Sequence, residues 1–266
     1  MKKAIKRLWE RARSLITDKK FVGLVLVLLL LSPSCSVFAN SLPDTDQDGV
    51  PDRDEKQVYY TDPESPDTDG DGYSDWVELN HGYSPHVVAR VKLENSDYDR
   101  DGLNDAMELK FGTNLSLKDS DGDGYTDGEE VDHGYDPLNS EPVKLAKRIE
   151  INTSEQELSY FLGGVRRGEF LISGGVPGMP TPKGHFRIRN KHPRAWSSYG
   201  LWMPYWMAIV DSGRFGIHQL PVWPNGHREG EEHLGQPASH GCVRLGLEAA
   251  KFLYDWTPVG TPVFIY

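Results

Sequence analysis

Cysteine and long hydrophobic runs are scarce in this 266-residue chain, which has only Cys35 and Cys242. If Cys35 leaves with a cleaved leader, one thiol remains; it has no internal disulfide partner, so it is free for reactivity. The apolar run Phe21–Leu31 spans 11 residues, whereas a transmembrane helix needs about 20. Basic residues are also few, with 29 Lys and Arg against 40 Asp and Glu. The net charge of −11 argues against nucleic acid as a partner, because its phosphates would be repelled.

The first 39 residues have the order of a secretory signal. Lysines and arginines come first, the apolar run follows, and Val37-Phe38-Ala39 suits cleavage after Ala39. We therefore predict a signal peptide over residues 1–39 and an exported protein of the periplasm or cell envelope. Because the basic segment is long, retention of the leader as an anchor stays open, and only then is membrane contact expected. Lipidation at Cys35 is disfavoured, since Ser32-Pro33-Ser34 is a poor lipoprotein signal.

The acidic residues are concentrated in the middle of the chain, where one pattern occurs four times. Residues 41–140 hold 27 Asp and Glu against 7 Lys and Arg. In each copy, oxygen ligands stand at positions 1, 3, 5, 9 and 12, glycine at position 6, and a residue that offers its carbonyl at position 7. These are the requirements of a 12-residue calcium loop. The predicted calcium ligands are Asp44, Asp46, Asp48, Val50, Asp52 and Glu55 in the first loop; Asp67, Asp69, Asp71, Tyr73, Asp75 and Glu78 in the second; Asp97, Asp99, Asp101, Leu103, Asp105 and Glu108 in the third; and Asp119, Asp121, Asp123, Tyr125, Asp127 and Glu130 in the fourth.

Calcium is favoured over a solvated acidic linker and over magnesium. A linker would rarely fill every ligand position four times, and magnesium demands a tighter octahedral shell. The loop starts are 23, 30 and 22 residues apart, too close for full helix–loop–helix units throughout. Residues 42–140 therefore resemble thrombospondin type-3 repeats, which implies a loop-rich module ordered by the metal.

The repeat module is interpreted as a rigid spacer that holds the C-terminal domain off a membrane or surface. A binding face for another envelope protein is the alternative interpretation. We expect calcium removal to loosen residues 42–140 and to leave the C-terminal domain folded, because such a module has little apolar core of its own.

A thiol beside a histidine and a glycine makes the C-terminal region a candidate catalytic domain. In Ser239-His240-Gly241-Cys242-Val243-Arg244-Leu245 the glycine before the thiol lets a substrate approach the backbone amides closely. His218 is a candidate base that takes the proton of Cys242. The alternative is a buried core cysteine, the more common state of an isolated Cys.

Short apolar alternations, broken by glycine and proline, predict a mostly β domain at the C-terminal end. Helical spacing of apolar residues over 247–254 predicts one short amphipathic helix. We expect strands at Ile149/Ile151, Leu158–Leu162, Glu169–Ser173 and Val263–Tyr266, with a turn at Gly163-Gly164.

Three segments of this region resemble the L,D-transpeptidase catalytic domain of bacterial cell walls. The segments are Ile149–Gln156 with Leu158; Ser173-Gly174-Gly175 followed by Thr181–Phe186; and Gly216-Ile217-His218 with Ser239–Arg244. The resemblance covers residues 146–266. It implies an L,D-transpeptidase-type β-sandwich or barrel with a short C-terminal helix.

The same resemblance implies an enzyme that acts on peptidoglycan stem peptides without a catalytic cofactor. Cys242 would form a thioester with release of D-alanine, and the amine of a second stem would resolve it into a 3-3 cross-link. The implied site residues are Cys242 as nucleophile, His218 as general acid and base, Gly241 and Cys242 as oxyanion amides, Ser239 and His240 as braces of the loop, and Arg244 as partner of a substrate carboxylate or of the loop.

Two departures from the family pattern concern the residues after His218. Gln219 stands where the family usually has glycine, and the polar stretch from His218 to Ser239 is longer than usual, which suggests a lid. Zinc is disfavoured because no His-Glu-x-x-His motif accompanies the candidate histidines His218, His227, His233 and His240.

Two further functions stay open. With the same Cys and His, water in place of an amine would give an L,D-carboxypeptidase or a cross-link-cleaving endopeptidase. The alternative from a different class is a calcium-dependent adhesion or scaffold protein that only grips peptidoglycan.

Overall fold

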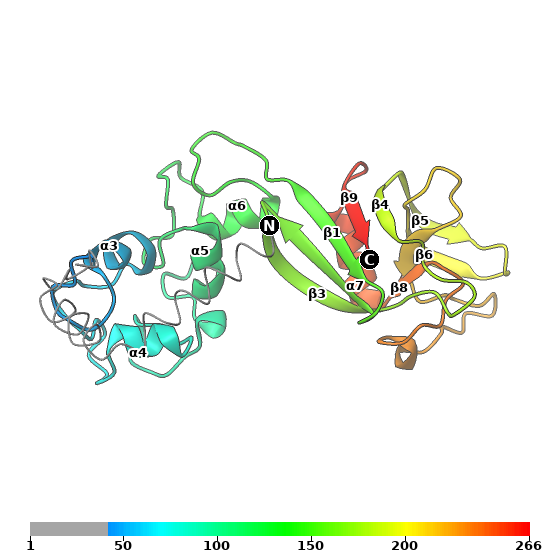
Figure 1. Cartoon of the computed structure of the whole chain (residues 1–266). Helices are drawn as coiled ribbons and strands as arrows, with labels where there is room; N and C mark the ends of the chain where they lie inside the picture. The colour runs from blue at the N-terminus through cyan, green and yellow to red at the C-terminus, as the bar shows by residue number, and fades with distance from the viewer. Residues whose placement is uncertain (1–41) are drawn as a thin grey trace, which may run out of the picture. The chain divides into compact units, whose positions relative to one another are not determined.

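The computed structural model describes residues 42–266 (Figure 1). The predicted signal peptide, with Cys35 and the cleavage point after Ala39, lies outside the described residues. From Asp44 to Tyr266 the chain forms one unit. Within residues 42–266, every helix is too short or too polar to span a lipid bilayer.

Each acidic loop leads into a short helix that begins at position 9 of the loop. In three loops the side chain at position 8 caps that helix: Ser74, Asn104 and Thr126 each accept a hydrogen bond from the amide three residues later. The cap fixes the register between loop and helix in these repeats. The elements, blue to green in Figure 1, are α3 (Asp52–Asp54) continued by the π-helix η1 (Glu55–Tyr59), α4 (Asp75–Asn80), the 3-10 helix η2 (Leu93–Asn95), α5 (Asp105–Phe111) and α6 (Asp127–His133).

Glycine at position 6 of each loop is required by the backbone conformation there. Gly49, Gly72, Gly102 and Gly124 have φ values between 98° and 110°, which residues with a Cβ rarely adopt. The turn brings the amide of position 7 onto the carboxylate of position 5, at 2.6 to 2.8 Å in all four loops. The sharp turn therefore gathers the aspartates on the inside of the loop.

The four loops are joined in two pairs, which accounts for their uneven spacing. Asp48 accepts a hydrogen bond from the Trp76 amide at 2.8 Å, and Asp101 accepts one from the Gly128 amide at 2.7 Å. In both pairs, a position-5 carboxylate thus bonds to the helix start of the following loop. Ser84 Oγ donates to Asp105 Oδ2 at 2.6 Å and connects the two pairs.

Nine strands form one sheet with the order β4-β9-β1-β2-β3-β8-β7-β6-β5. Neighbouring strands are antiparallel except for the parallel pairs β1·β9 and β7·β8. The strands are β1 (Lys147–Asn152), β2 (Glu157–Leu162), β3 (Val165–Ser173), β4 (Gly184–Arg187), β5 (Asn190–Trp196), β6 (Trp202–Ala208), β7 (Gly216–Gln219), β8 (Val243–Leu245) and β9 (Pro262–Ile265).

The core forms where one face of the sheet meets helix α7 (Leu247–Trp256). Ile149 and Ile151 of β1 and Leu158 of β2 are fully buried, and Ala250 and Leu253 of α7 belong to the same cluster. These residues are those whose spacing predicted the strands and the helix. The predicted mostly β domain with a short C-terminal helix is confirmed, and its inner strands β7 and β8 carry the candidate site.

Apolar side chains also connect the last two repeats to the sheet. Leu103 of the third loop and Val131 of α6 form a buried cluster with Leu162 of β2. Beside it, Asp132 of α6 forms an ion pair with Arg167 of β3 at 3.2 Å. Because α6 also carries the position-12 glutamate of the fourth loop, order in that loop and packing on the sheet are linked.

Candidate active site and acidic loops

A cavity of about 740 Å³ contains most of the predicted catalytic residues. Its size lies within the range of small-molecule sites. The predicted residues that line it are His218, Ser239, His240, Cys242 and Arg244. Residues more than 20 positions apart in sequence meet here because β7 and β8 are neighbouring parallel strands, with His218 opposite Arg244 in register.

The nucleophile candidate lies in a sharp turn just before β8. Gly241 has a φ of 109°, and a Cβ there would lie 2.6 Å from Cε1 of Phe215. Glycine is therefore needed both for the backbone conformation and for the approach of the Phe215 ring. The turn presents Cys242 to the cavity.

Ser239 fixes this turn from the inside. Its hydroxyl donates to the Cys242 carbonyl at 2.5 Å and accepts from the Gly241 amide at 3.1 Å. The Ser239 amide in turn donates to the Gly174 carbonyl at 2.9 Å, which attaches the turn to the end of β3. Of the two amides expected to face an oxyanion, the Gly241 N–H is hydrogen-bonded to Ser239 in this structure.

His218 is held as a neutral imidazole with one tautomer. Its side chain is buried, and Nδ1 donates to the Gln219 carbonyl at 2.5 Å, so Nε2 is the unprotonated nitrogen. Burial lowers the pKa of His218 to about 3, with a further lowering from the charge of Arg244. The group that orients the His218 ring is a backbone carbonyl, so Gln219 can provide it as well as the glycine that is usual at this position.

His240 lies apart from this hydrogen-bonded group. It is exposed, and its ring packs against Tyr199 with the ring centroids 4.5 Å apart. Both side chains line the cavity. The structure therefore places His240 at the cavity wall, in contact with the β5–β6 connection.

The reactivity of Cys242 is expected to rise steeply with pH. Burial raises the pKa of the Cys242 thiol, while a hydrogen bond from Gly216 and the charge of Arg244 act in the opposite direction. The thiol is thus mostly protonated at pH 7, and its alkylation rate should grow about tenfold per pH unit until the pH passes the usual thiol value of about 8.5. Iodoacetamide labelling followed by mass spectrometry measures this rate. The Cys242→Ala variant gives the background from Cys35, and a rate plateau below pH 7 would contradict the prediction.

Arg244 is occupied by the polar stretch between β7 and the Cys242 turn. Nη1 lies 2.9 Å from Glu229 Oε2 and donates to the Ala238 carbonyl at 3.1 Å. The arginine is 9% exposed. These contacts attach Arg244 to the stretch that precedes Ser239 and favour the second of its two predicted roles, fixing the loop. Glu229 is the partner that sequence reasoning missed, because nothing in the pattern says which loop carboxylate reaches β8.

The stretch 219–238, whose length suggests a lid, contributes little to the lining of the cavity in this structure. Trp223 and His227 close a small turn by a 2.7 Å backbone hydrogen bond, and Val222 pairs with Trp202 of β6. Pro221 is the one residue between Gln219 and Ala238 that lines the cavity. More of the lining comes from β5, β6 and their connection, through Trp196, Ser197, Ser198, Tyr199, Leu201, Met203 and Trp206.

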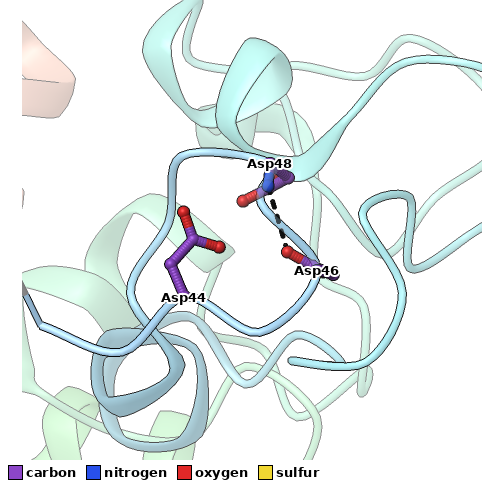
Figure 2. A group of neighbouring side chains, drawn as sticks. All are labelled: Asp44, Asp46 and Asp48. Carbon is purple, nitrogen blue, oxygen red and sulfur yellow. Dashed lines mark hydrogen bonds between the residues drawn. The ribbon is translucent and has the colours of Figure 1, made fainter.

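Metal-ligating side chains gather only in the acidic loops within residues 42–266. Each loop brings the aspartates of positions 1, 3 and 5 together, with ligand atoms within 4.8 Å of one another. Figure 2 shows the first such group, in which the Asp48 amide donates to Asp46 Oδ1 at 3.1 Å. No three histidines form such a group in the described part of the chain.

The loops fit a hard cation because they hold buried carboxylate oxygens without hydrogen-bond partners. In every loop these oxygens belong to positions 3 and 12, and such groups are costly to bury without a compensating charge. Burial and nearby aspartates raise the pKa of Glu78 to about 8 and that of Glu108 to about 9. The unpartnered oxygens are on Asp46, Asp69, Asp99, Asp121, Glu55, Glu78, Glu108 and Glu130.

The aspartates of position 9 also take part in hydrogen bonds within each loop. Asp52, Asp75 and Asp127 use both carboxylate oxygens to accept hydrogen bonds from the amide and hydroxyl of the position-2 residue, at 2.6 to 2.9 Å. Asp105 accepts from the Tyr98 amide and from Ser84. These hydrogen bonds brace each loop, and the aspartates of positions 1 and 5 accept backbone hydrogen bonds in the same way, as Asp67 and Asp48 do.

Comparison with known families agrees with both halves of this description. Residues 146–265 match the L,D-transpeptidase catalytic domain, and residues 67–82 and 119–140 match the bacterial TSP3 repeat. The two repeat matches contain the second and fourth loops. The resemblances drawn from the sequence are thereby confirmed.

Individual relatives share the same C-terminal region. The L,D-transpeptidase-type protein YciB of Bacillus subtilis (strain 168) is 31% identical over 124 residues, which are 44% of this chain and 64% of that protein. YqjB of the same organism is 25% identical over 142 residues, 48% of this chain and 76% of that protein. An L,D-transpeptidase structure from Mycobacterium smegmatis aligns with a TM-score of 0.41 at 20% identity, over 47% of this chain and 60% of that chain.

Proposed function

We propose that this chain, whose residues 146–265 match the L,D-transpeptidase catalytic domain, is an exported cysteine acyltransferase that forms 3-3 cross-links between peptidoglycan stem peptides. The observation that carries the proposal is the cavity itself. It is lined by a thiol in a strained glycine turn and by a buried histidine whose neutral tautomer leaves Nε2 free. These are the parts needed for thioester formation and its resolution.

In the first step, Cys242 attacks the carbonyl that joins the third stem residue to D-alanine. His218 takes the thiol proton at Nε2 as the sulfur–carbon bond forms, because neither a free thiolate nor an imidazolium is favoured in this buried site. The Cys242 amide donates to the developing oxyanion. His218 then gives the proton to the nitrogen of D-alanine, which leaves, and the stem remains bound as a thioester.

In the second step, the side-chain amine of another stem attacks the thioester carbonyl. His218 accepts a proton from that amine and returns it to the sulfur as the carbon–sulfur bond breaks. The products are an amide between the third residues of two stems and the regenerated thiol. One base thus serves both half-reactions, which is why a histidine held in a single tautomer is useful here.

The repeats are proposed to hold structural calcium and to space the enzyme from the surface to which the chain is delivered. The carboxylates of positions 1, 3, 5, 9 and 12 and the carbonyl of position 7 would bind the ions, and the position-9 aspartates would also brace each loop. The bound cations would offset the repulsion among these acidic groups. The signal-like first 39 residues support export to the periplasm or cell envelope, where another envelope protein is a possible partner of the repeats.

The test is to incubate the full-length protein with purified tetrapeptide muropeptides and to identify the products by mass spectrometry. Cross-linked dimers with loss of D-alanine are expected. Tripeptides alone would replace the transpeptidase by an L,D-carboxypeptidase, since water would then resolve the thioester. If D-alanine is not released and an acylating β-lactam leaves Cys242 unmodified, the chain is instead a peptidoglycan-binding scaffold.

A further inference from the structure

The cavity around Cys242 is lined by basic side chains and, among residues 42–266, by no acidic ones. Its basic residues are two arginines and two histidines. A cavity of this kind favours an anionic ligand, because a cation would meet only positive charge there. The charge of the two arginines, however, is not equally available.

Arg244 is compensated from outside the cavity. Glu229, which does not line the cavity, lies 2.9 Å from the Arg244 guanidinium. The same guanidinium nitrogen also donates a hydrogen bond to the Ala238 carbonyl. An anion that bound Arg244 would have to displace this carboxylate. Arg244 is therefore poorly suited to receive a substrate carboxylate.

Arg214 is the arginine whose charge remains available. It is exposed, and within residues 42–266 no carboxylate lies within ion-pair distance of it. The nearby acidic residue Asp211 pairs with Arg189 instead, at 3.4 Å. The guanidinium carbon of Arg214 lies 5.3 Å from the centroid of the Phe215 ring, which orients it by a cation–π contact.

The Phe215 ring connects this guanidinium to the nucleophile turn. The ring approaches Gly241 so closely that a Cβ there would lie 2.6 Å from it, and Gly241 directly precedes Cys242. A group bound by Arg214 would thus lie beside the turn that attacks the substrate. In the proposed reaction, the donor carries a carboxylate next to the scissile bond, on the D-alanine that leaves.

We propose that Arg214 binds the terminal carboxylate of the donor stem peptide and thereby selects donors that end in free D-alanine. The inference rests on the proposed function for the identity of the donor. A guanidinium suits a planar carboxylate because it forms two parallel hydrogen bonds with it. A carboxamide in the same place keeps the shape of the donor and loses the charge.

The test compares two probes, a synthetic stem tetrapeptide ending in D-alanine and the same peptide with a C-terminal carboxamide. Binding is measured by titration calorimetry on full-length Cys242→Ala protein, which cannot turn the probes over. We expect the carboxylate probe to bind about tenfold more tightly, and we expect Arg214→Gln to remove that preference while leaving carboxamide binding unchanged. Arg189→Gln, which deletes the same charge outside the cavity, is the matched control and should keep the preference.

The outcomes separate this inference from the proposed function. Equal binding of the two probes, or an equal loss in Arg189→Gln, overturns the carboxylate site even where the wild type forms an acyl adduct on Cys242. If the preference depends on Arg214 but the wild type forms no acyl adduct on Cys242, the carboxylate site is supported and the acyltransferase is overturned. Failure of both probes to bind overturns the carboxylate site, while the acyl adduct on Cys242 of the wild type decides the acyltransferase separately.

Discussion

Replacing Cys242 with alanine is expected to reduce D-alanine release and cross-linking by at least about 10³-fold, because no other group can form the acyl intermediate. Cys242 is the one free thiol within residues 42–266. The fold should survive the change, since the substitution removes a single sulfur atom from a partly buried side chain, a loss of about 1 kcal/mol. Product analysis by mass spectrometry and a thermal melt measure the two effects separately.

The two histidines of the cavity give the sharper control for this prediction. His218→Ala removes the base and should lower turnover by at least about 10²-fold, whereas His240→Ala removes an exposed ring packed on Tyr199 and should cost less than about tenfold. Residual turnover in Cys242→Ala, or equal losses in the two histidine variants, would contradict the assignment of nucleophile and base.

The fold and the main parts of the site could be predicted because both depend on short sequence patterns. A calcium loop is a local structure, in which a glycine with positive φ and aspartates two residues apart decide the geometry within 12 residues. The Cys242 turn is local as well, since Ser239 and Gly241 form its hydrogen bonds. The strands of the C-terminal domain followed from alternation, because one face of the sheet meets a buried core.

The contacts that could not be predicted from the sequence join residues whose separation in the chain matches neither helical nor strand periodicity. The Glu229–Arg244 ion pair links a loop to β8, and several acidic residues of that loop were equally plausible partners. The bond between Asp105 and Ser84 spans the gap between two loop pairs. Such pairings depend on the tertiary fold, which no local pattern in a single sequence reports.

Position 9 of the acidic loops makes contacts that the loop pattern by itself does not predict. The pattern of a 12-residue loop assigns an oxygen ligand there, often through water. In this chain the residue at position 2 of three loops is Thr45, Thr68 or Ser120, and its hydroxyl and amide engage both oxygens of the position-9 aspartate. A hydroxyl at position 2 is therefore the signal in the sequence for this additional hydrogen bond to position 9.

Removal of calcium is expected to lower the melting temperature of the whole described unit by about 10 to 20 °C. With a Kd of about 10⁻⁴ M, as in extracellular modules, about 1 mM calcium stabilises each loop by about 1.4 kcal/mol. Four loops then contribute about 5 to 6 kcal/mol, and a chain of this size changes its melting temperature by about 2 to 4 °C per kcal/mol. The measurement is a thermal melt followed by circular dichroism, with calcium and with a chelator.

Glu108→Gln tests the same linkage at one loop. Glu108 is buried with both carboxylate oxygens unpartnered, so its loss should weaken calcium binding and lower the melting temperature only when calcium is present. Glu94→Gln removes an exposed glutamate of η2, outside the loop pattern, and is the matched control. A calcium-dependent loss in both variants would mean that net charge rather than the loop is responsible.

The C-terminal domain is expected to share in the loss of stability, which revises the expectation drawn from the sequence that it would be unaffected. Glu130 of α6 closes the fourth loop, and the next two residues, Val131 and Asp132, contact Leu162 and Arg167 on the sheet. If calcium fixes α6, chelation loosens the cluster that covers this part of the sheet, and β3 continues from there to the segment bonded to Ser239. Hydrogen exchange of β2 and β3 should therefore speed up in chelator; two separate melting transitions, with the later one independent of calcium, would instead support two domains that unfold on their own.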